Sequence, residues 1–389
     1  MTLIKSISGI RGTIGGAPGD ALTPVDIVKF TYAYCSKLRE RRPKAEGERY
    51  KVVVGKDARL SGEMVESIVC GTLISCGVDV VKAGFASTPT TEMAVTFAGA
   101  DGGIIMPRLL KRLGVECVEL NCEPTGEFAH NPEPLPANLI GLSEAVVREK
   151  ADFGISVDPD VDRLALICED GKPFGEEYTL VSVADYLLER AYNEALETGK
   201  SLDEVCAPYC LATSSNLSSS RALRDVTEKF GGEYFAAAVG EVNVTTKMKE
   251  CGALIGGEGN GGVIYPALHY GRDAMVGVAL FLSNLAHKKM SVSELRKTYP
   301  QYIITKNRID LSDSSLIDKI LNEVKAVYAN ENVNTIDGVK VSFEDRKEWV
   351  HLRRSNTEPI IRIYAEAATE EAANALAAEV IDIAKKIIG

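Results

Sequence analysis

The sequence predicts a multi-domain α/β protein that ends in a separate α+β domain. Strand and helix patterns alternate through most of the 389 residues, which is typical of parallel sheets covered by helices. Near the C-terminus, three strand patterns come first and one long helix comes last, which indicates an α+β arrangement. A chain of this length is long enough for roughly two to four domains, each with its own core.

The first half of the chain alternates short apolar runs with longer segments of helical periodicity. The apolar runs are bounded by turn residues, as expected of strands, and the longer segments are typical of helices. The expected strands are residues 51–55, 78–81, 153–157 and 164–168, and the expected helices are 63–75, 107–114 and one that begins at Thr88. Residues 121–136 hold four prolines, so they are expected to form a loop.

The second half begins with the same alternation and then changes character. Residues 180–196 and 220–230 are expected to be helical, and residues 206–212 are expected to be extended. The strands of the α+β domain are expected at 339–343, 349–353 and 360–364, before an Ala-rich helix at 369–388.

Composition excludes several classes of partner. The net charge of -11 argues against nucleic acid or an anionic membrane surface as the main partner, so a phosphate site must be a local basic pocket. The nine cysteines are scattered and form no pair of Cys-x-x-Cys motifs, which argues against zinc and favours a reducing compartment. No apolar run reaches membrane-spanning length and no signal pattern opens the chain, so we expect a cytoplasmic protein.

The most informative stretch is Asp158-Pro159-Asp160-Val161-Asp162-Arg163, between two strand patterns. Carboxylates at alternate positions of a tight loop repel one another unless a cation lies among them. Oxygen ligands favour Mg²⁺ or Ca²⁺ over zinc or copper, and Arg163 adds a planar donor suited to a phosphate or carboxylate. The stretch predicts a divalent metal beside an anionic substrate.

Three other interpretations of this stretch stay open. An EF-hand also begins with alternating acids, and Glu169 falls at its twelfth position, but Arg163 stands where glycine is needed and the flanks are strand-like. An aspartyl phosphatase nucleophile also follows a strand, but a second strand comes next here. The third interpretation is a solvated acidic turn.

Two further loops carry groups that suit a phosphosugar. Residues 353–359 combine guanidinium, hydroxyl and amide groups in a turn between strands, a good environment for a phosphate dianion that Arg362 could also reach. The alternative is a helix capping box of Ser355 and Glu358, although the apolar run after Pro359 fits a strand better. The groups in this loop that suit a phosphate are Arg353, Arg354, Ser355, Asn356 and Thr357.

The second of these loops is glycine-rich. Five glycines in residues 256–262 allow close backbone approach, and Glu258 and Asn260 offer partners for vicinal sugar hydroxyls, although a plain turn has the same composition. Near the start of the chain, Ser8-Gly9-Ile10-Arg11-Gly12 is a flexible turn with one cation.

Taken together, these loops resemble the α-D-phosphohexomutase family. Residues 8–12, 55–62, 158–163, 256–262 and 353–362 match its motifs in the right order, so the resemblance spans nearly the whole chain. The glycine-rich loop, followed by Tyr265-Pro266 and Gly271-Arg272-Asp273, is most similar to the phosphoglucosamine mutase branch.

The resemblance implies three α/β domains and a C-terminal α+β domain around a central cleft. The implied boundaries are 1–106, 107–174 with the metal loop, 175–299 with the sugar loop, and 300–389 with the phosphate loop, the first two domains being truncated at their junction. By the same resemblance, Asp158, Asp160 and Asp162 would hold Mg²⁺, and Glu258 would bind sugar hydroxyls. Arg11 and Arg163 would lie near the transferred phosphate as catalytic cations. The distal phosphate would be bound by Arg353, Ser355, Asn356, Thr357 and Arg362.

The sequence departs from the family after Met106. Family members continue into Thr-Ala-Ser-His-Asn-Pro, whose serine carries the phosphoryl group, whereas this chain runs directly into the helix pattern at 107–114. Several dozen residues are missing against the family pattern, and no connecting residues are visible where about two to six are usual. Residues 115–120 could then close a strand–helix–strand unit. Either the sequence is incomplete here or the deletion is real. Ser8 and Ser61 are the nearest hydroxyl-bearing loop residues, but a structural role in turns explains them better than a role as the phosphoryl carrier.

These observations predict a phosphosugar mutase that interconverts glucosamine 6-phosphate and glucosamine 1-phosphate, or the glucose or mannose equivalents, through a bisphosphate. The alternative is a non-catalytic phosphosugar-binding protein, which follows if the deletion is real, because the phosphoryl relay is then absent. A weaker alternative is a metal-dependent phosphatase. The preferred sugar and the oligomeric state are left open by the sequence.

Overall fold

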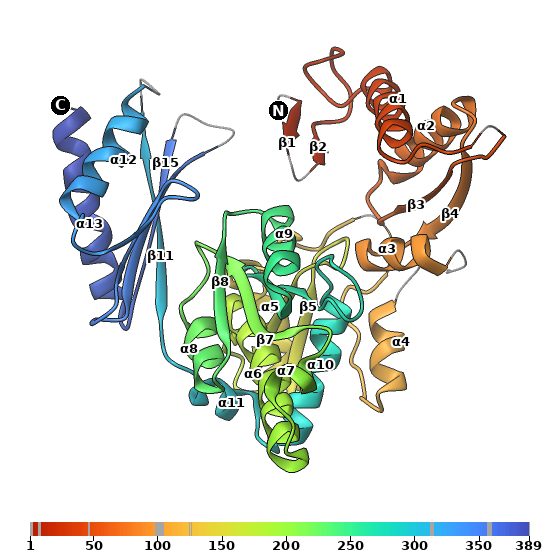
Figure 1. The fold of residues 1–389 in the computed structure, drawn as a ribbon. Helices are drawn as coiled ribbons and strands as arrows, with labels where there is room; N and C mark the ends of the chain where they lie inside the picture. The colour runs from red at the N-terminus through yellow and green to blue at the C-terminus, as the bar shows by residue number, and fades with distance from the viewer. Residues whose placement is uncertain are drawn as a thin grey trace. The chain divides into compact units, whose positions relative to one another are not determined.

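A computed structural model describes residues 3–6, 9–45, 47–97, 105–123, 125, 127–311, 315–355 and 360–388 (Figure 1). The chain divides into two compact units, each with its own cores. The first unit comprises residues 1–173 and 268–279, and the second comprises 174–267 and 280–389. No helix within the described ranges is long and apolar enough to cross a membrane.

The first unit begins with a hairpin and a parallel strand pair with its helices. Its elements are β1 (Ile4–Ser6), β2 (Gly9–Arg11), α1 (Pro24–Arg41), β3 (Lys51–Lys56), α2 (Gly62–Ser75), β4 (Asp79–Phe85) and α3 (Thr88–Phe97). β3 and β4 pair in parallel, and α2 connects them, as the sequence predicts. Buried Cys35, Leu73 and Val78 form the core between α1, α2 and this strand pair.

The rest of the first unit contains the antiparallel pair that carries the acidic loop. Its elements are α4 (Ile105–Arg112), the 3₁₀ turn η1 (Pro136–Asn138), α5 (Ile140–Glu149), β5 (Phe153–Val157) and β6 (Leu164–Cys168). The predicted strands 153–157 and 164–168 are confirmed, and Val146 of α5 packs in a core with Ile167 of β6. The strand–helix–strand unit that residues 115–120 could have closed does not form, because these residues take no regular structure and pair with no strand in the described part of the chain.

The second unit begins with a four-stranded sheet in the order β10-β9-β7-β8. Its elements are α6 (Glu176–Thr198), α7 (Leu202–Cys206), β7 (Cys210–Asn216), α8 (Ala222–Lys229), β8 (Glu233–Ala237), α9 (Glu241–Cys251), β9 (Ala253–Glu258), β10 (Gly262–Ile264), α10 (Ala274–Lys288) and α11 (Val292–Thr298). Helix α10 starts in the first unit and continues into the second. The predicted extended segment 206–212 begins too early, because a capping box of Ser201 and Glu204 starts α7, which holds Cys206.

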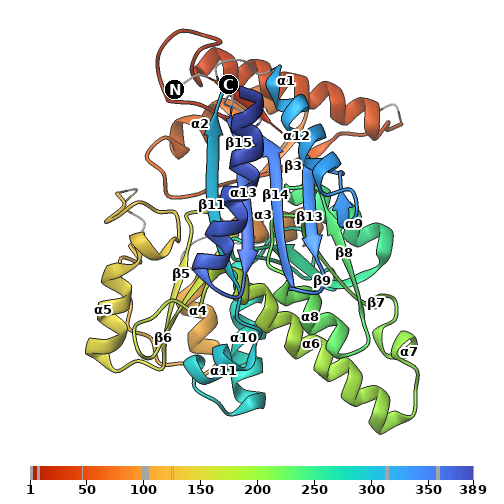
Figure 2. The same ribbon diagram turned by 90° about the vertical axis from the view of Figure 1, so that its left-hand side faces the viewer.

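The chain then forms a five-stranded antiparallel sheet in the order β11-β15-β14-β13-β12. Its elements are β11 (Ile303–Asp310), α12 (Leu316–Val327), β12 (Asn332–Asn334), β13 (Val339–Phe343), β14 (Glu348–Arg354), β15 (Ile360–Ala367) and α13 (Glu370–Ile388). Figure 2 shows α12 and α13 along one face of this sheet, where alternate strand residues form the core. The predicted strands and the final helix are confirmed.

Residues after β7 contact this five-stranded sheet through buried polar groups. The Lys340 ammonium donates to the Leu217 carbonyl over 2.7 Å, and the Arg221 N–H donates to Glu366 over 2.9 Å. His351 Nε2 lies 2.6 Å from the Asp337 carbonyl oxygen and must donate to it. Its Nδ1 therefore accepts from the Ser218 hydroxyl, 3.0 Å away, which fixes a neutral tautomer in this interface.

The buried ring makes stability depend on pH. Burial lowers the pKa of His351 from 6.5 to about 4. Between pH 6.5 and pH 4, therefore, this ring is protonated in the unfolded chain and neutral in the folded chain. We expect this group to remove up to roughly 3 kcal/mol of stability as the pH falls through that window. We expect the free energy of unfolding in urea to fall as the pH is lowered from 6.5 to 4 in the wild type. In His351→Gln this fall should be smaller by the contribution of the ring. The exposed His130→Gln is the matched control, and an unchanged slope in His351→Gln would contradict the assignment.

Candidate functional site

The loop between β5 and β6 is built around the carboxylate of Asp158. Its Oδ1 accepts the backbone N–H groups of Asp162 and Arg163, each over 3.0 Å, and its carbonyl accepts from Val161. This folds the loop tightly enough to place Val161 at φ +60°, a conformation that β-branched residues rarely adopt. Backbone strain of this kind persists only where surrounding contacts hold it, and it concentrates at functional sites.

The turn brings the three predicted carboxylates together. Asp158, Asp160 and Asp162 each offer an oxygen, and these oxygens lie within 4.8 Å of one another. Asp158 and Asp162 are buried at 3% and 5% exposure, so the interpretation as a solvated acidic turn is wrong. Strands on both sides likewise exclude the helix–loop–helix of an EF-hand.

The electrostatics of the triad fit a cation. Burial, together with the charges of Asp158 and Asp160, raises the pKa of Asp162 to about 8, although the charge of Arg272 opposes this. Asp162 Oδ1 is also buried with no hydrogen-bond donor. A hard divalent cation would neutralise the clustered charge and coordinate this oxygen, so the residues present fit Mg²⁺.

Two arginines neutralise part of the triad. Arg163 Nε donates to Asp158 Oδ2 over 2.9 Å, and Arg163 Nη1 donates to Glu133 over 3.2 Å. In this structure the predicted phosphate ligand Arg163 therefore contacts carboxylates. Burial would raise the pKa of Asp158, but hydrogen bonds within the loop and the charge of Arg163 hold it below its usual value. The second arginine, Arg272, precedes α10 and pairs with Asp162 Oδ2.

Thr88 at the start of α3 holds the middle of the loop. Its N–H donates to the Asp160 carbonyl and its hydroxyl to Asp160 Oδ2, both over 2.9 Å. Sequence analysis missed Thr88 and Arg272 as parts of this site, because they lie 72 and 110 residues from their partners. Arg11 is exposed at the end of β2, and no hydrogen bond or ion pair joins it to the triad in the described structure.

The predicted sugar loop lies at a reversal of strand order. β7 is parallel to β8 on one side and to β9 on the other, and the loops after β7 and β9 leave the same edge. Ligands of open α/β sheets bind at such positions. Glu258, the last residue of β9, is buried at this edge, which supports the prediction that it contacts a ligand.

Neighbouring side chains hold Glu258 in place. Asn216, at the end of β7, donates through Nδ2 to Glu258 Oε1 over 3.0 Å, and Ser219 Oγ accepts the Gly259 N–H over 3.0 Å. Sequence analysis missed these two supports, although a run of hydroxyl and amide residues after β7 is a usable signal. Asn260 Oδ1 accepts the Gly262 N–H over 3.2 Å, so this predicted sugar ligand also closes the turn.

Part of the glycine content is structural. A Cβ on Gly257 would lie 2.0 Å from the carbonyl oxygen of Gly262 on the paired strand β10, and backbone cannot move aside. The close pairing of β9 with β10 therefore accounts for Gly257, and the ligand interpretation rests on Glu258 and the side chains that hold it.

Replacing Asn216 with Ala is expected to weaken binding of the predicted phosphosugar about tenfold, because Glu258 loses a donor that helps to orient it. Isothermal titration of the two proteins measures this. The control is Asn332→Ala, which removes an exposed amide that bonds Glu344 in the same unit. Equal affinity of Asn216→Ala and wild type would contradict the positioning role.

The predicted phosphate loop joins β14 to β15 and lies beside a row of arginines. Arg353 on β14 and Arg308 on β11 are both directly opposite Arg362 on β15, so the three lie on one face of the sheet. Arg362 stands between the core residues Ile361 and Ile363, so this face is the one that α12 and α13 leave uncovered. Arg353 Nε is buried without a hydrogen-bond partner, as expected of a donor that awaits an anion.

The remaining loop residues are placed only in part. Ser355 is buried, and its N–H donates to the Ile360 carbonyl over 3.0 Å at the mouth of the hairpin. The predicted ligands Asn356 and Thr357 lie outside the described residues, as does Ser8. The capping-box interpretation of Ser355 is wrong, because the chain continues as strand β15 from Ile360. Arg308 was missed, because only strand register brings it beside Arg362.

Comparison with known proteins agrees with this architecture. The chain matches four models of the phosphoglucomutase/phosphomannomutase group: α/β/α domain I over residues 3–107, domain II over 71–171, domain III over 177–302, and the C-terminal domain over 308–383. Together these matches span nearly the whole chain in the family's order. The chain therefore belongs to the α-D-phosphohexomutase family.

Individual relatives extend the comparison. A phosphoglucomutase/phosphomannomutase of Thermococcus kodakarensis is 29% identical over 460 positions, with 93% of this chain and 95% of the relative covered. A phosphoglucosamine/phosphogalactosamine mutase of Sulfurisphaera tokodaii is 26% identical, with 98% of each chain covered. The fold is also that of a Burkholderia thailandensis phosphoglucomutase/phosphomannomutase family protein, at a TM-score of 0.75 and 22% identity, with 96% and 95% of the two chains covered.

Proposed function

We propose that this chain binds a hexosamine or hexose phosphate together with Mg²⁺, at the loops of a mutase that interconverts glucosamine 6-phosphate and glucosamine 1-phosphate through a bisphosphate. The observation that carries the proposal is the buried aspartate triad, in which Asp162 Oδ1 has no donor and two guanidiniums lie alongside. The glucosamine assignment is supported by relatives named as phosphoglucosamine mutases, and glucose and mannose phosphates are the alternatives within the class.

The chain's own residues divide the work. Asp158, Asp160 and Asp162 would hold the metal, which when bound supplies positive charge to a transferring phosphoryl group. Arg163 and Arg272, already placed at the triad, would hold the anion beside it once the metal takes over the carboxylates, with Arg11 as a third cation. Glu258 would accept sugar hydroxyls, and Asn260 would add an amide.

The second phosphate of the substrate would be bound at the C-terminal sheet. The arginine row of Arg308, Arg353 and Arg362 supplies charge, and Ser355, Asn356 and Thr357 would supply hydroxyl and amide groups from the loop. We further propose the four domain boundaries expected from the sequence, at residues 106, 174 and 299.

We infer that the phosphoserine segment is absent from this chain. Two findings support this: alignments with full-length relatives extend over 460 to 479 positions although this chain has 389 residues, and the first- and second-domain matches share residues 71–107. Without that serine the chain has no phosphoryl relay, which favours a second candidate function: a phosphosugar-binding protein that does not turn over.

Phosphorus NMR of the protein with glucosamine 6-phosphate, Mg²⁺ and a trace of the bisphosphate separates the candidates. Accumulation of glucosamine 1-phosphate supports the mutase. Saturable binding without a new signal supports the binding protein, and free phosphate indicates a phosphatase instead. The intact mass of the protein purified from its native source should also be measured. A mass several kilodaltons above 41.9 kDa would show that the native protein contains the serine segment.

A further inference from the structure

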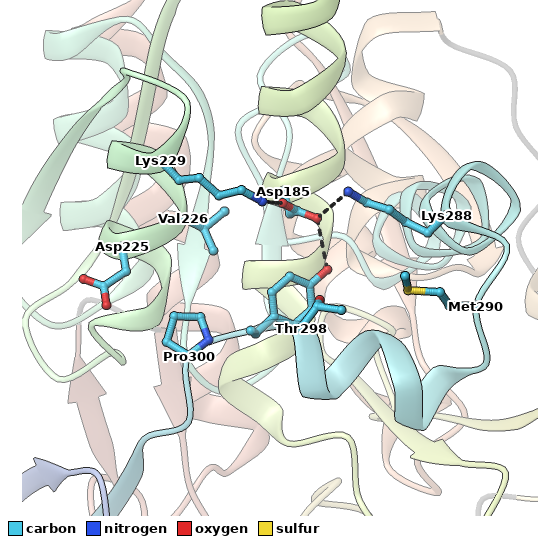
Figure 3. Close-up of a pocket in the computed structure, with 9 residues that line it drawn as sticks. Asp185, Asp225, Val226, Lys229, Lys288, Met290, Thr298 and Pro300 are labelled. Atoms are coloured by element: carbon cyan, nitrogen blue, oxygen red, sulfur yellow. Dashed lines mark hydrogen bonds and ion pairs between the residues drawn. The ribbon is translucent and has the colours of Figure 1, made fainter.

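A polar cavity lies in the second unit, and none of its lining residues belongs to the proposed sugar or phosphate loops. Its volume is about 460 Å³, within the size range of small-ligand sites. Helices α6, α8 and α10 and the residues that follow α10 and α11 form its walls (Figure 3). Charged groups line one side, and apolar Val226, Met290 and Pro300 line the remainder.

Asp185 on α6 is the central polar group of this cavity. It is only 2% exposed, and Figure 3 shows its carboxylate between the side chains of Lys229 and Lys288. The ammonium groups of Lys229 and Lys288 lie 3.6 and 3.4 Å from its Oδ1 and Oδ2, beyond close hydrogen-bond distance. Asp185 Oδ1 accepts no hydrogen bond and has the Lys229 ammonium as an ion-pair partner, so it keeps the capacity to accept a donor from a ligand.

The nearby donors are engaged with other acceptors, so Asp185 Oδ1 has room for a further hydrogen bond. The Tyr299 hydroxyl donates to Asp185 Oδ2 over 3.3 Å, and burial raises the pKa of Tyr299, so it stays a neutral donor. The Lys288 ammonium forms an ion pair with Glu189 over 2.5 Å. The Lys229 side chain is 60% exposed and directs its ammonium toward Asp185. A group that both donates to Asp185 Oδ1 and accepts from Lys229 would complete the arrangement.

The charges select among ligand classes. The two lysines are balanced by Asp185 and Glu189, and Asp225 on the same wall adds a further carboxylate, which itself pairs with Arg221 and Lys347. Among the residues that line the cavity, the two lysines are matched by the two carboxylates Asp185 and Asp225, so its wall carries no net positive charge to attract a phosphate. Hydroxyl groups match the need, because each can donate to a carboxylate and accept from an ammonium, and the apolar wall suits the C–H face of a sugar.

We propose that this cavity binds a small neutral polyol of the unphosphorylated sugar class, with neighbouring hydroxyls that donate to Asp185 and accept from Lys229 and Lys288. The site is separate from the proposed phosphosugar loops, and it does not depend on whether the chain turns over.

Titration of the full chain with D-glucose, followed by saturation-transfer NMR, tests the site. Saturable binding in the millimolar range is expected, and Lys229→Met should weaken it about tenfold through loss of one ammonium. Lys229 is exposed, so its replacement leaves the fold intact, and Asp185→Asn provides a second variant inside the cavity. Lys247→Met on α9 removes a lysine that does not line the cavity and should bind like the wild type.

Three outcomes would overturn the proposal. The first is the absence of saturable glucose binding. The second is loss of binding in Glu258→Gln, which would place the sugar at the glycine-rich loop instead. The third is tight binding of inorganic phosphate that Lys229→Met abolishes, which would make this cavity an anion site.

Discussion

Replacing Asp160 with Asn is expected to lower the affinity of the protein for Mg²⁺ or Mn²⁺ at least about tenfold. Asparagine keeps the size of the side chain but removes one of the three negative charges that face the cation. Asp160 is the best member of the triad to test, because Asp158 also holds the loop backbone and Asp162 also pairs with Arg272, whereas Asp160 accepts from the neutral Thr88 hydroxyl, which an amide oxygen can also accept. Isothermal titration with metal, and electron paramagnetic resonance of bound Mn²⁺, measure the change directly.

The control for this substitution is Asp170→Asn, which removes the same charge from the exposed turn after β6, where Asp170 pairs with Lys172. Its metal affinity should equal that of the wild type. If Asp160→Asn binds metal as tightly as the wild type, the triad is not the metal site. Unfolding by urea should confirm that both variants keep the wild-type fold.

Replacing Glu258 with Gln is expected to weaken glucosamine 6-phosphate binding by roughly ten- to a hundredfold. A hydrogen bond to a charged acceptor is worth about 1.5–3 kcal/mol, and the buried carboxylate at the end of β9 is the acceptor that sugar hydroxyls would lose. The arginine row is untouched, so affinity for inorganic phosphate should be unchanged. Titration with the phosphosugar and with phosphate alone separates the two contributions.

The matched control is Glu250→Gln on α9, where the exposed carboxylate pairs with Lys247 and should not affect the sugar. Parallel loss of sugar and phosphate affinity in Glu258→Gln would indicate a general disturbance of the second unit. Unchanged affinity for the phosphosugar would remove Glu258 from the proposed site.

The metal loop could be predicted from the sequence because its parts are neighbours in the chain. Asp158 to Arg163 lie between two apolar runs, and any tight turn between paired strands brings alternate carboxylates together. The strain at Val161 could not be predicted, because it results from the hydrogen bonds that Asp158 accepts. Residues 115–120, which could have closed a strand–helix–strand unit, form no strand, because a strand needs a neighbour to pair with and none is paired with them in the described structure.

The residues that complete each site depend on contacts distant in sequence. Thr88 reaches Asp160 because α3 begins beside the metal loop, and Arg272 reaches Asp162 from the start of α10. Asn216 meets Glu258 because β7 and β9 are parallel neighbours whose ends leave the same edge. Arg308 joins Arg353 and Arg362 only through the register of three strands.

The sequence by itself therefore determined the fold class and the residues that chemistry requires within single loops, because periodicity and turn composition are local properties. The tertiary structure decided which of those groups are buried, which are already paired, and which distant side chains orient them. Those properties follow from strand order, register and the packing of one element on another, and no local pattern encodes them. The cavity around Asp185 is the clearest case, since four segments between residues 185 and 300 meet there.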